Sequence, residues 1–186
     1  YLTENYRIQA RGLISGGSDL LLVETSQDIL NVKAAVEGIN AAKIDLNKSD
    51  IPIAIQCTIE NMGTTLAGQD IESFYLSIKH LDLLWVGMNC ATGPKFMREH
   101  LRTLNQISTH PIALVPNAGL PDEHGKYNEE PIEFAKVVKE YVSNGWVNII
   151  GGCCGTELSH IKELSNISNQ SSEFFDKNKN LTKMNS

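Results

Sequence analysis

The chain has 186 residues, of which 41% are hydrophobic and 20% are charged, and this composition is typical of one globular domain with a sizeable core. A formal net charge of −6 argues against a nucleic acid or an anionic membrane as a partner, because both attract clustered basic surfaces. The apolar runs are far shorter than a membrane span, and the first residues lack the apolar segment of a signal peptide. We therefore expect a cytoplasmic protein.

Helices and short apolar strands are expected to alternate along the whole chain. A helix over 3–16 precedes a strand at 20–23, which should stop at Glu24. Ser26 is expected to cap the next helix, which runs to about residue 42. The same alternation predicts further strands at 51–55, 83–88, 112–115 and 147–150, and helices at 70–80, 94–107, 131–143 and 156–167.

Continuously apolar strands separated by helices indicate an α/β protein with a parallel sheet. The unusual polar and sulfur-bearing residues all follow strands, as on the active face of a (β/α)8 (TIM-type) barrel. A full barrel takes about 250 residues. We therefore expect an incomplete, carboxyl-terminal portion of such a barrel, with about five parallel strands and six helices over residues 1–167 and a polar linker over 168–186. The first residue, Tyr1 and not Met, agrees with this expectation.

Three of the four cysteines follow predicted strands. Cys90 ends the run from residue 83, while Cys153 and Cys154 lie between glycines directly after the strand at 147–150. Parallel strands bring such positions to one edge, so three thiolates can hold zinc and leave its fourth position open. The alternatives are two disulfides, disfavoured by the adjacent pair, or cysteines that serve only as small apolar residues. The latter interpretation is preferred for Cys57 alone.

The number and type of the ligands indicate the chemistry. Three thiolates make zinc a poor Lewis acid for a carbonyl group, but zinc deprotonates an incoming thiol and leaves its sulfur nucleophilic. Alkyl transfer to sulfur is therefore expected. A zinc hydrolase is disfavoured, because histidine and carboxylate ligands are lacking, and the short cysteine knuckles of structural zinc sites are lacking as well.

Three polar residues at strand ends are candidates for substrate binding. Glu24 ends an apolar strand, where a buried carboxylate needs a cation such as a substrate ammonium group, although a helix cap or a salt bridge is the alternative. Asn89 can orient the substrate, and Asn117 can fill the open position on zinc until substrate arrives. For both asparagines, a role in forming a turn is an equal alternative.

Several motifs resemble the homocysteine S-methyltransferase family, and more narrowly its cobalamin-dependent methionine synthase branch. The similarity covers about residues 10–165. Betaine-dependent and S-methylmethionine-dependent relatives share the double cysteine, whereas the motif Asn-Ala-Gly-Leu-Pro favours the cobalamin branch. The segments that carry the resemblance are Leu22–Thr25, Thr64–Gln69, Val86–Cys90, Pro116–Pro121, Gly125–Tyr127 and Gly151–Thr156.

The resemblance implies a (β/α)8 barrel with zinc held by Cys90, Cys153 and Cys154, and with the amino group of homocysteine at Glu24. It further implies methyl transfer from methylcobalamin to homocysteine, which forms methionine. The cobalamin-binding and folate-binding modules that recharge this donor from 5-methyltetrahydrofolate are not in this chain. The isolated chain is expected to be inactive because strands of the barrel are missing, and a non-catalytic zinc-binding fragment remains the alternative of another class.

Overall fold

Five parallel strands form one sheet, with the strands in chain order, in the computed structural model of the protein, which describes residues 1–169. Each strand pairs only with its neighbours along the chain, as in the wall of a barrel. The expected α/β architecture is confirmed. The strands are β1 (Leu21–Ser26), β2 (Ile53–Cys57), β3 (Val86–Asn89), β4 (Ile112–Val115) and β5 (Ile149–Ile150).

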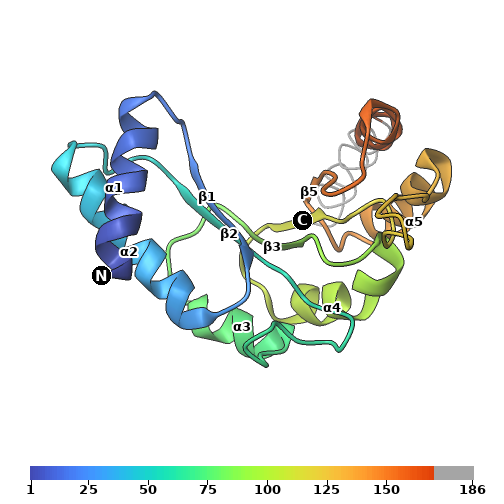
Figure 1. Cartoon of the computed structure of the whole chain (residues 1–186), viewed down its shortest axis with the longest axis horizontal. Helices are drawn as coiled ribbons and strands as arrows, with labels where there is room; N and C mark the ends of the chain where they lie inside the picture. Colours follow the sequence, from blue (N-terminus) through green and yellow to red (C-terminus); the bar gives the residue numbers. More distant parts are fainter. Residues whose placement is uncertain (170–186) are drawn as a thin grey trace, which may run out of the picture.

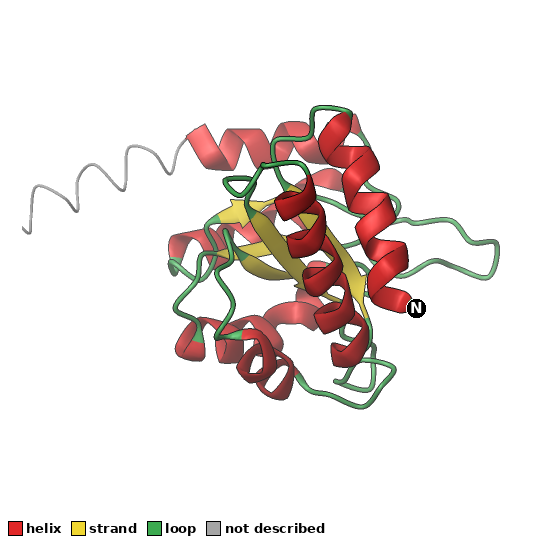
Figure 2. Ribbon diagram, turned by 90° about the vertical axis from the view of Figure 1, so that its left-hand side faces the viewer, coloured by secondary structure: helices red, strands yellow, loops and turns green. Residues whose placement is uncertain are grey.

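Helices connect the strands and cover the outer side of the curved sheet (Figure 1). In the view of Figure 2, α1 and α2 pack side by side in front of the sheet. None of the helices in residues 1–169 combines the length and the apolar character needed to cross a membrane. The helices are α1 (Leu2–Ser15), α2 (Ile29–Asp45), α3 (Ile71–Ile78), α4 (Pro94–Ile107), α5 (Pro131–Ser143) and a last helix over 158–169.

The two faces of the sheet carry side chains of different size. Large apolar residues such as Ile55, Met88 and Leu114 are fully buried in the core between the sheet and the helices. On the opposite face, Gly87 lies beside Ala113, and a Cβ atom at Gly87 would be 2.3 Å from the Ala113 carbonyl oxygen. Small residues therefore let the strands approach closely on the inner face.

β1 continues beyond the expected end at Glu24. It runs to Ser26, and its register against β2 shifts between Val23 and Ser26. The expectation that Ser26 caps α2 is wrong, because Ser26 pairs with Cys57 in the sheet. Asp28 caps the helix instead, and its carboxylate accepts a hydrogen bond from the Leu30 N–H at 2.8 Å.

The last strand is shorter than the sequence predicts, and the last helix extends further. β5 has only two residues, since the side chain of Asn148 accepts the Ile112 N–H at 2.8 Å where a backbone carbonyl would otherwise pair. The last helix passes the expected domain boundary at residue 167 and continues to residue 169. Most of the expected linker, residues 170–186, lies outside the described residues.

Candidate metal centre

The three cysteines meet at the carboxyl ends of β3 and β5, which flank β4. Cys90 follows β3 directly, and its N–H donates to the Val115 carbonyl at the end of β4. Cys153 is tied to the same strand end, because its N–H donates to the Pro116 carbonyl at 2.8 Å. Backbone hydrogen bonds to β4 therefore fix both cysteine loops. The structure confirms the expectation that Cys90, Cys153 and Cys154 lie close together.

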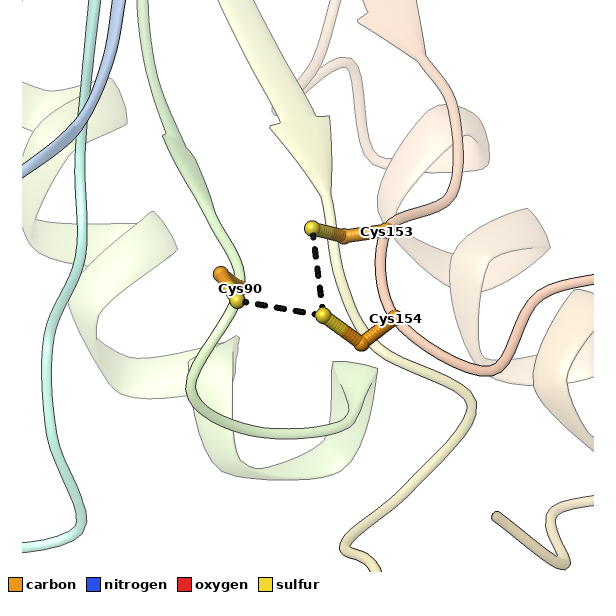
Figure 3. A group of neighbouring side chains, drawn as sticks. All are labelled: Cys90, Cys153 and Cys154. Carbon is orange, nitrogen blue, oxygen red and sulfur yellow. Dashed lines mark hydrogen bonds between the residues drawn. The ribbon is translucent and has the colours of Figure 1, made fainter. Parts of the chain in front are cut away.

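The spacing of the sulfur atoms suits one metal ion. All three Sγ atoms lie within 4.8 Å of one another, and Cys154 is 3.6 Å from Cys90 and 3.9 Å from Cys153 (Figure 3). A tetrahedral ion with bonds of ~2.3 Å separates its sulfur ligands by about 3.8 Å. All four cysteines are free, so the disulfide alternative does not apply. The cluster can hold a metal ion with little rearrangement.

Deprotonation of the clustered thiols is unfavourable, because neighbouring thiolates repel one another. Burial, followed by the neighbouring Cys90 thiol, raises the pKa of Cys153 to about 12. A metal cation reverses this balance, because it favours the thiolate form of each ligand. The lone Cys57 behaves differently. It is fully buried in the apolar core, and burial raises the pKa of its thiol to about 12, so its predicted role as an apolar residue fits the structure.

The two asparagines are buried and bind the protein itself. Asn117 is 2% exposed, and its Oδ1 accepts the Cys154 N–H at 3.0 Å. Asn89 is 1% exposed; its Oδ1 accepts the Thr25 N–H at 2.9 Å, while its Nδ2 donates to the Thr25 hydroxyl at 2.8 Å. Both amide groups thus hold backbone at the rim of the sheet, which is the turn-forming alternative that the sequence left open.

Glu24 is exposed, contrary to the expectation of a buried carboxylate. The reason is its position on β1, an outer strand of the sheet, where no further strand covers it. Within residues 1–169 its carboxylate has no hydrogen bond or ion pair. Glu24 lines a cavity of about 300 Å³ together with Tyr6, Leu13 and Leu22. None of the three cysteines lines this cavity, so the cavity and the sulfur cluster are separate features.

Two residues at the site were not identified from the sequence as candidates. Thr25 has a left-handed backbone (φ 54°) and links Glu24 to Asn89; it lies in the segment Leu22–Thr25 that carries the family resemblance, but the sequence does not indicate this role. Tyr127 packs on Gly155, where a Cβ atom would be 2.2 Å from the Tyr127 Cγ. Burial, followed by the neighbouring Cys154 thiol, raises the pKa of Tyr127. The segment Gly125–Tyr127 carries part of the family resemblance, but the sequence does not indicate that Tyr127 packs on the cysteine loop.

The fold and the site define a barrel-type α/β protein with a cluster of three cysteines that can hold a metal ion. The profile of the homocysteine S-methyltransferase family matches residues 1–168, which is nearly the whole described chain. The chain belongs to this family.

Solved structures of the homocysteine methyltransferase MmuM from Escherichia coli share the fold. The oxidized form matches with a TM-score of 0.62 at 17% identity, over 88% of this chain and 52% of that chain. The apo form matches with a TM-score of 0.60 at 17% identity, over 89% of this chain and 57% of that chain. The metallated form matches with a TM-score of 0.60 at 16% identity, over 87% of this chain and 51% of that chain. This chain therefore spans about half the length of these proteins.

Proposed function

We propose that this chain forms the carboxyl-terminal part of a (β/α)8 barrel that transfers a methyl group to the thiol of homocysteine, giving methionine. The observation that carries the proposal is the cluster of Cys90, Cys153 and Cys154, within 4.8 Å, in a member of the homocysteine S-methyltransferase family. Zinc is the ion that best fits a set of three thiolates. When bound, it supplies a deprotonated but still nucleophilic substrate sulfur.

Glu24 is proposed to bind the ammonium group of homocysteine. Its carboxylate is exposed and has no partner among residues 1–169, so it is available to a ligand cation. It directly precedes Thr25, whose N–H bonds Asn89, and Asn89 directly precedes Cys90. This short path supports an arrangement in which one small amino thiol reaches both the carboxylate and the metal centre. Asn117 supports the same centre by holding the Cys154 backbone.

The methyl donor is proposed to be methylcobalamin, carried and recharged from 5-methyltetrahydrofolate by cobalamin-binding and folate-binding modules of the same system. The motif from Asn117 to Pro121 supports this branch of the family over the betaine and S-methylmethionine branches. A cytoplasmic location is part of the proposal, because four free cysteines suit a reducing compartment.

The donor is tested by assaying the zinc-loaded protein, with its barrel complete, against methylcobalamin, betaine and S-methylmethionine in parallel. We expect methionine from methylcobalamin and none from the other two. Methionine from betaine or S-methylmethionine alone would assign the chain to another branch. The Cys153→Ser protein serves as the control that excludes methyl transfer without the metal centre.

A zinc-binding module without activity is the second candidate. The observation in its favour is that the chain spans about half the length of the solved methyltransferases. Homocysteine binding separates the two functions, because a purely structural zinc site gives no reason for an added amino thiol to bind. Calorimetric titration of L-homocysteine into the zinc-loaded protein, with its barrel complete, therefore decides between them.

A further inference from the structure

A pair of hydrogen bonds ties the end of β1 to the end of β3, across β2. The side chain of Asn89 accepts the Thr25 N–H at 2.9 Å and donates to the Thr25 hydroxyl at 2.8 Å. Asn89 is 1% exposed although Thr25 is exposed, so the amide group of Asn89 is shielded from water in both bonds. Thr58, at the end of β2, completes the connection, because its hydroxyl donates to the Asn89 carbonyl at 2.9 Å.

Both segments joined by this pair have strained backbones. Thr25 has a φ of 54°, an unfavourable conformation for a β-branched residue, and it lies where the register of β1 shifts. Cys90 and Ala91 have φ values of 64° and 57°. Such conformations are unfavourable for residues other than glycine and persist only where surrounding contacts impose them. The bonds of Asn89 are the contacts that impose the turn at Thr25.

We propose that Thr25 and Asn89 are a positioning pair that fixes the distance between Glu24 and the cysteine cluster, and that this distance selects the chain length of the amino thiol. The inference rests on the proposed function, in which Glu24 binds the ammonium group and the metal centre binds the sulfur. Glu24 precedes Thr25, and Cys90 follows Asn89, so the hydrogen-bonded pair connects the backbone segments that carry the two proposed anchors.

Chain length matters because the ligand is held at both ends. Homocysteine and cysteine carry the same ammonium and thiol groups and differ by one methylene, so a fixed distance between anchors suits only one of them. A rigid site discriminates such a pair by roughly 10–200-fold. A turn free to move toward the cysteines would accommodate the shorter ligand, and discrimination would fall.

Thr25→Val tests the pair, since valine keeps the branched shape and removes only the hydroxyl. The zinc-loaded protein is titrated with L-homocysteine and with L-cysteine, and zinc content is measured after each titration. We expect the preference for homocysteine to fall about fivefold, the typical effect of one hydrogen bond, at unchanged zinc content. Thr25→Ala, which removes the same hydroxyl, should give the same fall, and Thr25→Ser should restore the preference.

Thr103→Val is the control, because Thr103, like Thr25, is not buried, and its hydroxyl donates to the Glu99 carbonyl within α4, away from the pair. Its homocysteine preference should equal that of the unsubstituted protein. An equal loss of affinity for both amino thiols in Thr25→Val and Thr25→Ala, or no change in their ratio, would overturn the positioning role while leaving the proposed function intact. Failure of the unsubstituted protein to bind either amino thiol would overturn the proposed function and this inference together.

Discussion

The four cysteines of the chain are chemically alike but differ in their surroundings. Cys57 is fully buried among apolar side chains, whereas the other three share one partly exposed cluster. Cysteine in an apolar core acts as a small hydrophobic residue. Clustered thiols resist deprotonation unless a cation binds the resulting thiolates. Which cysteines are placed to bind a metal ion therefore depends on their position in the fold and not on residue type.

Serine in place of any one clustered cysteine should abolish zinc binding. Cys90→Ser, Cys153→Ser and Cys154→Ser each leave two thiolates, too few for a stable site with one open position. Metal analysis after gel filtration measures the result, with about one zinc per chain expected for the unsubstituted protein. Cys57→Ser is the control and should retain zinc. Full zinc content in the Cys153→Ser protein would remove Cys153 from the ligand set.

Glu24→Gln should weaken homocysteine binding without changing zinc content. The substrate ammonium loses a charge-assisted hydrogen bond worth roughly 1.5–3 kcal/mol, so the Kd should rise about 10-fold to 100-fold. Titration calorimetry on the zinc-loaded protein measures the change. Glu37→Gln, on the exposed side of α2, should have no effect. An unchanged Kd in the Glu24→Gln protein would exclude Glu24 from the binding site.

At the scale of elements, the long loop after β4 supports the loop that carries Cys153 and Cys154. The Ala118 N–H donates to the Cys154 carbonyl at 2.9 Å, and Asn117 accepts the Cys154 N–H. Further along this loop, the Glu129 carbonyl lies 2.9 Å from Nε2 of His160 on the last helix. The geometry of the cluster therefore depends on a second, sequence-distant loop.

Gly155→Ala should disrupt the cluster through this loop contact. Gly155 has a φ of 75°, and an added Cβ atom would lie 2.2 Å from the ring of Tyr127. Backbone strain and overpacking together should cost roughly 2–4 kcal/mol of unfolding free energy, and zinc affinity should fall. Denaturant unfolding and zinc titration measure both effects.

Gly125→Ala provides the matched control on the same loop. Gly125 has a φ of 77°, but nothing lies within 4 Å of an added Cβ atom. It should cost only the backbone strain, about 1 kcal/mol, and leave zinc affinity unchanged. Equal effects of the two substitutions on zinc affinity would show that the contact between Gly155 and Tyr127 does not support the metal centre.

At the scale of the whole molecule, the metal centre joins two distant parts of the sheet. Cys90 follows β3 while the other two ligands follow β5, so one ion would cross-link segments that are more than 60 residues apart in sequence. A ligand that binds only the folded state stabilises it by a free energy that rises with the logarithm of the ratio of free ligand concentration to Kd. Zinc should therefore stabilise the fold as well as activate a substrate.

Removal of zinc should lower the Tm. Unfolding of the zinc-loaded protein is followed with and without a chelator, and a difference of several degrees is expected because bound metal contributes free energy only to the folded state. Added zinc should reverse the effect. The Cys154→Ser protein should unfold at the same temperature with and without the chelator. A chelator effect of equal size in that variant would place the stabilising metal elsewhere.

The order of the elements, the parallel α/β fold and the grouping of three cysteines could all be predicted from the sequence. These features are encoded locally, because apolar runs of strand length, helix periodicity and the position of a residue after a strand can all be read from neighbouring residues. The helices at 94–107 and 131–143 were predicted to the residue, since a proline fixes the start of each.

The surroundings of the polar residues could not be predicted from the sequence, because they depend on contacts between distant segments. Glu24 is exposed because β1 lies at the edge of the sheet, and its strand continues to Ser26 through a shift in register. Asn89 bonds Thr25, 64 residues away in sequence, and Asn117 bonds Cys154. Hydrogen-bond partners of this kind depend on which strand ends are neighbours and on the register between the strands. Packing of the whole sheet sets that register, and no local sequence pattern encodes it.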